Sequence, residues 1–221
     1  MDPNTSDSLA RHIYGELKQC VPSDEYLSER AILAVRNDVV HDINGPLLDQ
    51  LPGEKVTLLS NDETQGDDTS LNLPIEYLNS ISAGSLPPHK LSIKVGCAIM
   101  LLRNIDPPQG LCNGTHLKVI RTTRYTLECS ILGNRRPVRI GGRFSAIENR
   151  TILLPRMYCD ADGSSTNYIQ LRRKQFPVRV CFAMTINKSQ GQSLQKVGIL
   201  LNHEVRHGNN YRIIISRSIA I

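Results

Sequence analysis

The strongest candidate for chemistry in this sequence is a lysine set among amide and hydroxyl side chains. The string comprises Thr185, Asn187, Lys188, Ser189, Gln190 and Gly191. Lys188 supplies a point positive charge, its neighbours supply uncharged donors, and Gly191 lets the backbone approach a ligand closely. These groups suit the phosphate oxygens of a nucleic acid or a nucleotide. The alternative interpretation is an ordinary polar turn between a strand and a helix.

The elements around this string determine whether it can form a site. Residues 178–186 (VRVCFAMTI) are apolar and rich in β-formers, which predicts a central strand ending at the lysine string. Ligands bind at the carboxyl ends of strands in open α/β sheets. Residues 29–35 predict a second buried strand, followed by a helix over 37–43 with Asn37 as its cap. The ends of the chain therefore favour an α/β layer.

The middle of the chain has a different pattern. Short strands are expected at 91–102, 117–121, 125–131 and 138–140. Turn residues separate them, and close spacing of this kind favours a small β-barrel. The acidic string 60–70 predicts an exposed loop, and residues 9–20 predict a short amphipathic helix.

The charge distribution indicates an anionic partner. The chain has 221 residues and a net charge of +5. Residues 1–92 carry 6 Lys/Arg against 15 Asp/Glu, a net charge of −9, whereas residues 93–221 carry 20 against 6, a net charge of +14. A solvated basic surface is the alternative explanation. The apolar content of 40% argues against extensive disorder, and no apolar run is long enough to cross a bilayer, so no membrane partner is expected.

Two patterns that resemble metal or disulfide sites are weak. The six cysteines are irregularly spaced and form no C-x-x-C pair, so neither a zinc framework nor a dense disulfide scaffold is predicted. The string His203-Glu-Val-Arg-His207 matches the H-E-x-x-H zinc protease pattern, but Gly208 interrupts the helix that this chemistry needs. No metal site is therefore expected.

Longer blocks of the sequence resemble one enzyme family. Residues 171–199 (LRRKQFPVRVCFAMTINKSQGQSLQKVGI) resemble the motif V region of the Pif (petite integration frequency) family of ATP-dependent 5′→3′ DNA helicases. Residues 26–44 resemble its motif IV region and residues 78–120 its 2B domain. His207-Gly208 with Tyr211 and Ser216-Arg217 is similar to motif VI.

The resemblance implies a fold and a domain organisation. The chain would be an incomplete RecA-like lobe of the P-loop NTPase type, interrupted by a small SH3-like β-barrel. Residues 1–25 would form a leader or inter-lobe linker helix, 26–74 and 146–221 the second RecA-like lobe, and 75–145 the 2B domain.

It also implies roles for individual residues. The backbone of single-stranded DNA would be contacted by Thr185, Asn187, Lys188 and Ser189. Gln190 and Gly191 would lie toward the ATP cleft, and Arg217 would be the arginine finger on the γ-phosphate. Arg103, Asn113 and Thr115 would line the DNA channel, with turn formation and barrel packing as their alternative roles.

Two departures from the family pattern concern motifs IV and VI. The family has Thr-Pro-Thr-Asn where this chain has Ala34-Val-Arg-Asn37. Motif VI is one residue longer here between Tyr211 and Ser216, which in a helix would rotate Arg217 by about 100°. Three consecutive isoleucines, 213–215, weaken a helix at this point.

The sequence lacks the G-x-x-x-x-G-K-[ST] loop that cradles nucleotide phosphates. ATP and Mg²⁺ are therefore expected as cofactors of a complete helicase and not of this chain alone, which would be a C-terminal fragment inactive by itself. Its expected partners are single-stranded DNA and a first RecA-like lobe or a full-length helicase. The alternative is a non-catalytic DNA- or protein-binding module. The resemblance implies roles in DNA repair, recombination and telomere maintenance in the nucleus, with the mitochondrion as the alternative location.

Overall fold

The computed structural model describes most of the chain. The described residues are 3–15, 17–64, 73–82, 84, 86–133, 138–140, 143–145, 151–161, 170–190, 192–205 and 208–220. For residues 3–5, 138–140, 143–145, 202–205 and 208–220 the description covers the backbone alone.

The helices are few and the strands many. The helical elements are α1 (Pro3–Tyr14), α2 (Asp24–Ser28), α3 (Asn37–Gln50), α4 (Ile75–Ser80), and the 3₁₀ turns η2 (Pro107–Gln109) and η4 (Ile186–Lys188). The strands of the first half are β1 (Arg30–Ala34), β2 (Val56–Leu59), β3 (Asn61–Thr64), β4 (Lys90–Ile93), β5 (Ala98–Leu101), β6 (His116–Thr122) and β7 (Thr126–Ile131). Those of the second half are β8 (Val138–Ile140), β9 (Arg143–Ser145), β10 (Thr151–Pro155), β11 (Met157–Asp160), β12 (Leu171–Gln175), β13 (Val178–Val180), β14 (Ala183–Thr185), β15 (Ser193–Val205) and β16 (Gly208–Ala220).

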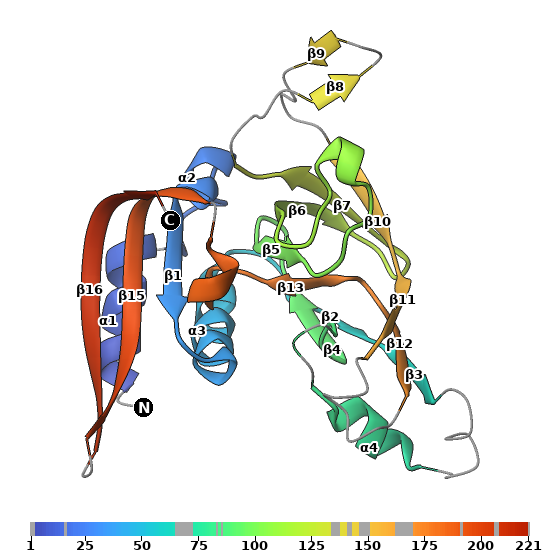
Figure 1. Cartoon of the computed structure of the whole chain (residues 1–221), viewed down its shortest axis with the longest axis horizontal. Coiled ribbons are helices and arrows are strands. Elements are labelled where there is room, and N and C mark those ends of the chain that lie inside the picture. The colour runs from blue at the N-terminus through green and yellow to red at the C-terminus, as the bar shows by residue number, and fades with distance from the viewer. Residues whose placement is uncertain are drawn as a thin grey trace.

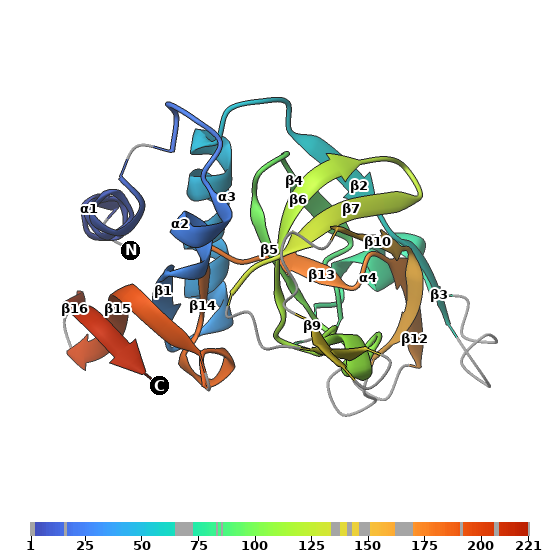
Figure 2. The ribbon, with the colours of Figure 1, turned by 90° about the horizontal axis from the view of Figure 1, so that it is seen from above.

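One part of the molecule is the expected α/β layer. Four strands pair in the order β14-β1-β15-β16, with β1 parallel to both β14 and β15, and β16 antiparallel to β15 (Figure 1). Helices α1 and α3 lie on the same side of this sheet (Figure 2). In β1 every residue after Arg30 is buried, because Ala31 and Leu33, on the other face of the sheet, cluster with residues of the antiparallel sheet such as Met100.

The β-rich middle is an antiparallel sheet of five strands, in the order β10-β7-β6-β5-β13. No pairing between the described strands joins β10 to β13, so the expected SH3-like barrel is not closed. The expected strand at 138–140, β8, pairs with β9 and not with β7, and the outer strands of the sheet are β10 and β13. Strands β2 and β4 pair separately, as do β8 and β9.

The apolar string 178–186 was predicted as one strand, and this prediction is wrong. Its first part, β13, pairs antiparallel with β5, whereas its second part, β14, pairs parallel with β1. The residues between them, Cys181 and Phe182, are buried. The string 91–102 is likewise two strands, β4 and β5. Gly96 has a φ of 84° at the turn between them, where a Cβ atom would collide with the Val21 side chain.

Three expected boundaries also differ. Helix α3 begins at Asn37, so its cap is Arg36 and not Asn37, and the Asp38 carboxylate accepts a hydrogen bond from the Val39 N–H instead. The helix continues to Gln50 with Pro46 inside it. Helix α1 ends at Tyr14, well before residue 20.

The acidic segment 60–70 is not entirely a loop. Its start forms β3, the edge of a three-stranded antiparallel sheet in the order β11-β12-β3, and residues 65–70 lie outside the described residues. Asp62 of β3 is buried and bonds to Arg173 of β12. This ion pair explains why an acidic string enters the interior.

All six cysteines lie in the described part of the chain and are free thiols. Among the described helices, none has the length and apolarity needed to cross a membrane.

Candidate nucleic-acid interface

The lysine string follows the carboxyl end of a parallel strand, but this strand, β14, lies at the edge of its sheet and not at its centre as predicted. Strand β14 ends at Thr185, which pairs with Ala34, the last residue of β1. The 3₁₀ turn η4 follows at once, and Lys188 is its last residue. We call residues 186–190 and 192 the η4 turn. It lies where the two main sheets meet (Figure 1).

Buried side chains hold β14 beneath the turn. The Asn44 side chain of α3 donates to the Ala183 carbonyl at 3.0 Å and accepts from the N–H groups of Phe182 and Ala183 at 2.8 and 2.9 Å. The Tyr14 hydroxyl of α1 donates to the Phe182 carbonyl at 2.6 Å. Because burial disfavours the phenolate, the pKa of Tyr14 is raised well above its usual value and the hydroxyl stays a donor.

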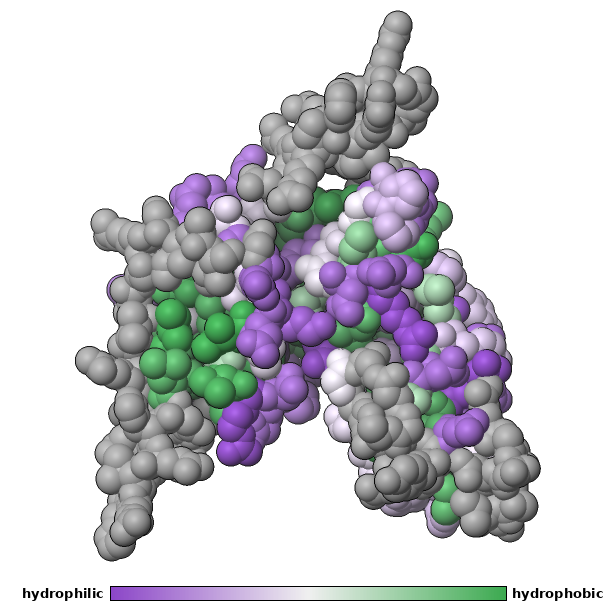
Figure 3. Space-filling view, in the orientation of Figure 1, coloured by the Kyte–Doolittle hydropathy of each residue, from purple (hydrophilic) through white to green (hydrophobic). Residues whose placement is uncertain are grey.

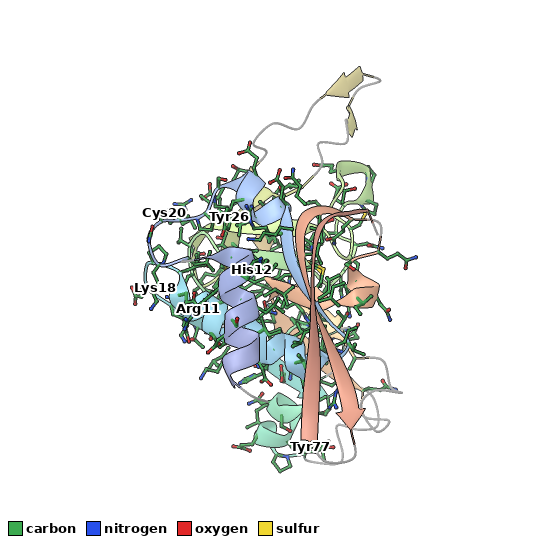
Figure 4. The ribbon with its side chains drawn as sticks, turned by 90° about the vertical axis from the view of Figure 1, so that its left-hand side faces the viewer. Arg11, His12, Lys18, Cys20, Tyr26 and Tyr77 are labelled. Carbon is green, nitrogen blue, oxygen red and sulfur yellow. The ribbon has the colours of Figure 1, made fainter. Side chains whose placement is uncertain are left out.

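Tyr14 is itself held by the segment that follows α1. Its carbonyl accepts a hydrogen bond from the Tyr26 hydroxyl. Figure 4 shows Tyr26 near one end of α1. The Arg30 guanidinium lies 4.0 Å from the centre of the Tyr26 ring, a cation–π contact. The first residues of the chain therefore support the strand that carries the η4 turn.

The predicted contact residues differ in exposure. Asn187, Lys188 and Gln190 are exposed, and Thr185 is half-buried. Ser189 is fully buried, and its hydroxyl donates to the Ile186 carbonyl at 2.7 Å. The role of Ser189 in the structure is thus to close the turn. Gly191 lies outside the described residues.

The structure brings two predicted residues from distant segments together. The Lys188 ammonium donates to the Asn113 side-chain oxygen at 3.2 Å. The Asn113 backbone N–H in turn donates to the Asn104 side-chain oxygen at 2.8 Å. On the face shown in Figure 3, the region where η4 lies in Figure 1 is hydrophilic. A cation and several amides therefore share one exposed area.

The other two predicted residues of this loop make intramolecular bonds. The Thr115 hydroxyl donates to the Gly110 carbonyl at 2.8 Å and accepts from the Cys112 N–H at 3.1 Å. The Arg103 guanidinium donates to the Asp160 carbonyl at 2.8 Å. Thr115 thus forms the turn, which was its alternative role, and Arg103 connects the loop to β11.

Sequence reasoning missed a histidine at this junction. The Gln192 side-chain nitrogen lies 3.1 Å from His116 Nε2. Burial lowers the pKa of His116 to about 4, so the ring is neutral at neutral pH. Because the amide nitrogen of Gln192 can only donate, Nε2 is the acceptor of this bond. The available signals were the position of His116 immediately before a predicted strand and of Gln192 within the lysine string.

Arg217 lies in β16 and not in a helix, consistent with the isoleucines before it. Its backbone pairs with Lys196, which also pairs with Arg30, the first residue of β1. The η4 turn instead follows Thr185, level with the last residue of β1. The structure therefore does not place the Arg217 backbone at the level of the turn, and its role as an arginine finger stays a prediction.

The zinc protease pattern gains no support. His207 lies outside the described residues. Within the described residues, no group of three or more His, Cys, Asp or Glu side chains could hold a metal ion.

Comparisons with known proteins agree with the resemblance in the sequence. Residues 76–122 match the family model described as DNA helicase Pif1, 2B domain. An ATP-dependent DNA helicase PIF1 from Xenopus laevis is 29% identical over 213 residues, which is 96% of this chain and 29% of the relative. The chain is similar to the Pif1 DNA helicases over almost its whole length. The human ATP-dependent DNA helicase PIF1 is 26% identical over the same shares of the two chains. This chain thus spans about three tenths of these Pif1 relatives.

Solved structures show the same fold relationship. The Pif1 helicase from Candida albicans matches with a TM-score of 0.56 and 23% identity, covering 90% of this chain and 44% of that one. A structure of Pif1 helicases unwinding forked double-stranded DNA matches with a TM-score of 0.50 and 20% identity, covering 90% and 37%. The fold is therefore that of part of a Pif1 helicase.

Proposed function

We propose that this chain binds the backbone of single-stranded DNA through the η4 turn, as the C-terminal part of an ATP-dependent 5′→3′ DNA helicase. The observation that carries the proposal is the position of Lys188. Its exposed ammonium follows the carboxyl end of a parallel strand, and two of its three protons are not used by Asn113. Exposed Asn187 and Gln190 add uncharged groups beside it.

The charge of the C-terminal half and the similarity to named helicases support the same function. Residues 93–221 carry a net charge of +14, which attracts a polyanion. The relatives from Xenopus laevis and human are named ATP-dependent DNA helicases. The phosphates of single-stranded DNA fit a lysine flanked by amides, because such contacts position the strand without reading its bases.

This chain would supply only part of an ATP site. The proposal gives this chain a 2B domain and a second RecA-like lobe, with Gln190, Gly191 and Arg217 as the contributors to the cleft. The 221-residue sequence contains no Walker loop. ATP and Mg²⁺ would therefore be bound together with a first RecA-like lobe, in cis or from a partner, and hydrolysis would need both lobes.

Fluorescence anisotropy with labelled oligo(dT), measured at several salt concentrations, tests the DNA-binding function. We expect binding at low salt that weakens as salt rises. Lys188→Ala should raise Kd about tenfold, since a charged hydrogen bond is lost. It should also make the plot of log K against log salt shallower by about 0.7, the value for one phosphate contact on a single strand.

Lys55→Ala is the matched control. Lys55 is an exposed lysine paired with Asp49, beyond the end of α3 and away from the η4 turn. Its loss removes the same charge, so it should leave Kd within about twofold if binding is local to the turn. Absence of binding at low salt, or an equal loss for both variants, would contradict the proposed function.

A further inference from the structure

Two side-chain contacts connect the η4 turn to the antiparallel sheet. The first joins Lys188 to Asn113, and the second joins Gln192 to His116. Asn113 lies on the connection from β5 to β6, and His116 is the first residue of β6. Each is more than seventy residues away from its partner in the turn. The turn after β14 is thus held from the other sheet.

Gln192 fixes the shape of the turn as well as its position. Its side-chain nitrogen lies 3.1 Å from His116 Nε2 and donates to the Lys188 carbonyl at 3.4 Å. Its backbone N–H donates to the Ser189 carbonyl at 3.0 Å. The amide therefore contacts both the antiparallel sheet and the residue that carries the exposed charge.

The backbone of His116 is fixed by the antiparallel sheet. It pairs with Met100 in the sheet, and its carbonyl accepts from the Leu132 N–H at 2.8 Å. The Cys181 sulfur lies 3.8 Å from the same Nε2 atom. A neutral imidazole offers one acceptor nitrogen, which matches a donor from Gln192.

We infer that His116 and Gln192 are positioning residues that orient the η4 turn so that Lys188 can meet a DNA phosphate, while Asn113 holds the ammonium from one side. The inference rests on the proposed function of Lys188. It assigns the antiparallel sheet a part in DNA binding that needs no direct contact between His116 and the nucleic acid. Without the Gln192–His116 bond, the turn would sample several orientations before it binds DNA.

Oligo(dT) anisotropy on the 221-residue chain tests the inference with paired substitutions. His116→Leu and Gln192→Leu remove the bond with little change of volume, and each should raise Kd about fivefold, corresponding to one uncharged hydrogen bond. His116→Gln places an acceptor oxygen near the position of Nε2 and should restore Kd to within about twofold of the original chain.

A double variant shows whether His116 acts through Lys188. In a Lys188→Ala background, His116→Leu should raise Kd no further, because the contact that it positions is already gone. If the two losses add, or if His116→Leu and Gln192→Leu leave Kd unchanged, the inference is overturned. If Lys188→Ala alone has no effect, the proposed function fails instead.

Val119→Ala separates positioning from loss of stability. Val119 is fully buried on the same strand as His116 and belongs to the main core. Its truncation should lower the urea midpoint at least as much as His116→Leu, but leave Kd and the salt dependence unchanged. A rise in Kd for Val119→Ala equal to that for His116→Leu would show that DNA binding merely follows stability, and would also overturn the inference.

Discussion

Lys188 and Arg173 lie in one block of sequence, yet the fold uses their charges in opposite ways. Arg173 is 1% exposed and donates to both Asp62 oxygens and to four backbone carbonyls. Lys188 is exposed, and its ammonium donates to Asn113 at 3.2 Å. Arg173 thus has its donors occupied by the protein, whereas Asn113 takes one of the three Lys188 protons among the residues that the structure describes. A cationic side chain can bind a ligand only where the protein does not already occupy its hydrogen-bond donors.

The surroundings of Asp62 strengthen this contrast. Its carboxylate also accepts from the Ser60 hydroxyl at 2.6 Å, and His89 Nδ1 lies 3.9 Å away. The carbonyls that Arg173 reaches belong to residues on and after α4. The ion pair therefore fastens the α4 segment to the three-stranded sheet.

The largest expected effect comes from breaking the buried ion pair. Arg173→Met should lower the free energy of unfolding by about 3–5 kcal/mol, because it leaves the Asp62 charge buried and unpaired. Urea unfolding followed by circular dichroism measures the change. The double variant Arg173→Met with Asp62→Leu should regain much of the loss, since no unpaired charge remains. Arg172→Ala, a half-exposed neighbour, should cost far less; an equal cost would contradict the comparison.

Removing the Asn44 amide should have the next largest effect. Asn44→Ala leaves the N–H groups of Phe182 and Ala183 without their acceptor, so we expect a loss of about 2–3 kcal/mol in the free energy of unfolding. Because β14 carries the η4 turn, oligo(dT) affinity should fall as well. Asn187→Ala, on the exposed turn, should change stability by less than about 0.5 kcal/mol. Stability unchanged by Asn44→Ala would show that β14 does not depend on this side chain.

The lowered pKa of His116 predicts a smaller effect, a dependence of the free energy of unfolding on pH. Its pKa is lowered to about 4 by burial, whereas an unfolded chain takes up the proton near pH 6.5. Between these values the unfolded state binds more protons, so stability falls as the pH drops from about 6.5 to about 4. The Gln192 amide and the Cys181 thiol lie beside the ring, and burial raises the pKa of this thiol to about 12.

Comparison with His116→Gln isolates this effect from the carboxyl groups that titrate in the same range. The original chain should lose about 2 kcal/mol more than the variant between pH 6.8 and 4.5, a figure discounted for the partial exposure of the residue. Urea midpoints at the two pH values provide the measurement. Parallel losses for the two proteins would show that His116 is not a buried neutral base.

The smallest effect is expected at an exposed cation that already has a carboxylate partner. Arg121 donates to Glu128 at 2.9 Å on the surface of the antiparallel sheet. Arg121→Ala should change the free energy of unfolding by less than about 1 kcal/mol and Kd for oligo(dT) by less than about twofold. A larger loss of affinity would extend the DNA contact from the η4 turn to β6.

The sequence predicted the position of Lys188 better than the strands around it. A buried strand ending at a polar, lysine-containing string placed Lys188 correctly, because chain order alone determines which residues come directly after a strand. It could not show that 178–186 divides between two sheets. An apolar run indicates burial, but does not identify the partner strand, and here β5 and β1 each pair with one part of it.

Roles of individual side chains were harder to predict, since they depend on contacts between distant segments. Ser189 and Lys188 are adjacent and both polar, yet one is buried and the other exposed. Arg173 and Asp62 look like surface charges until β12 and β3 pair. The meeting of Asn113 with Lys188 and of His116 with Gln192 needs the junction of two sheets, which no local pattern contains.

The crossing from β13 to β14 has a mechanical consequence. Only Cys181 and Phe182 separate these strands, and both are buried, so no slack linker lies between the two sheets at this point. A force applied to the turn after Thr185 is transmitted along the three residues of β14 to β13, the edge strand of the antiparallel sheet. Tension from a strand of DNA would thus be shared by both halves of the molecule.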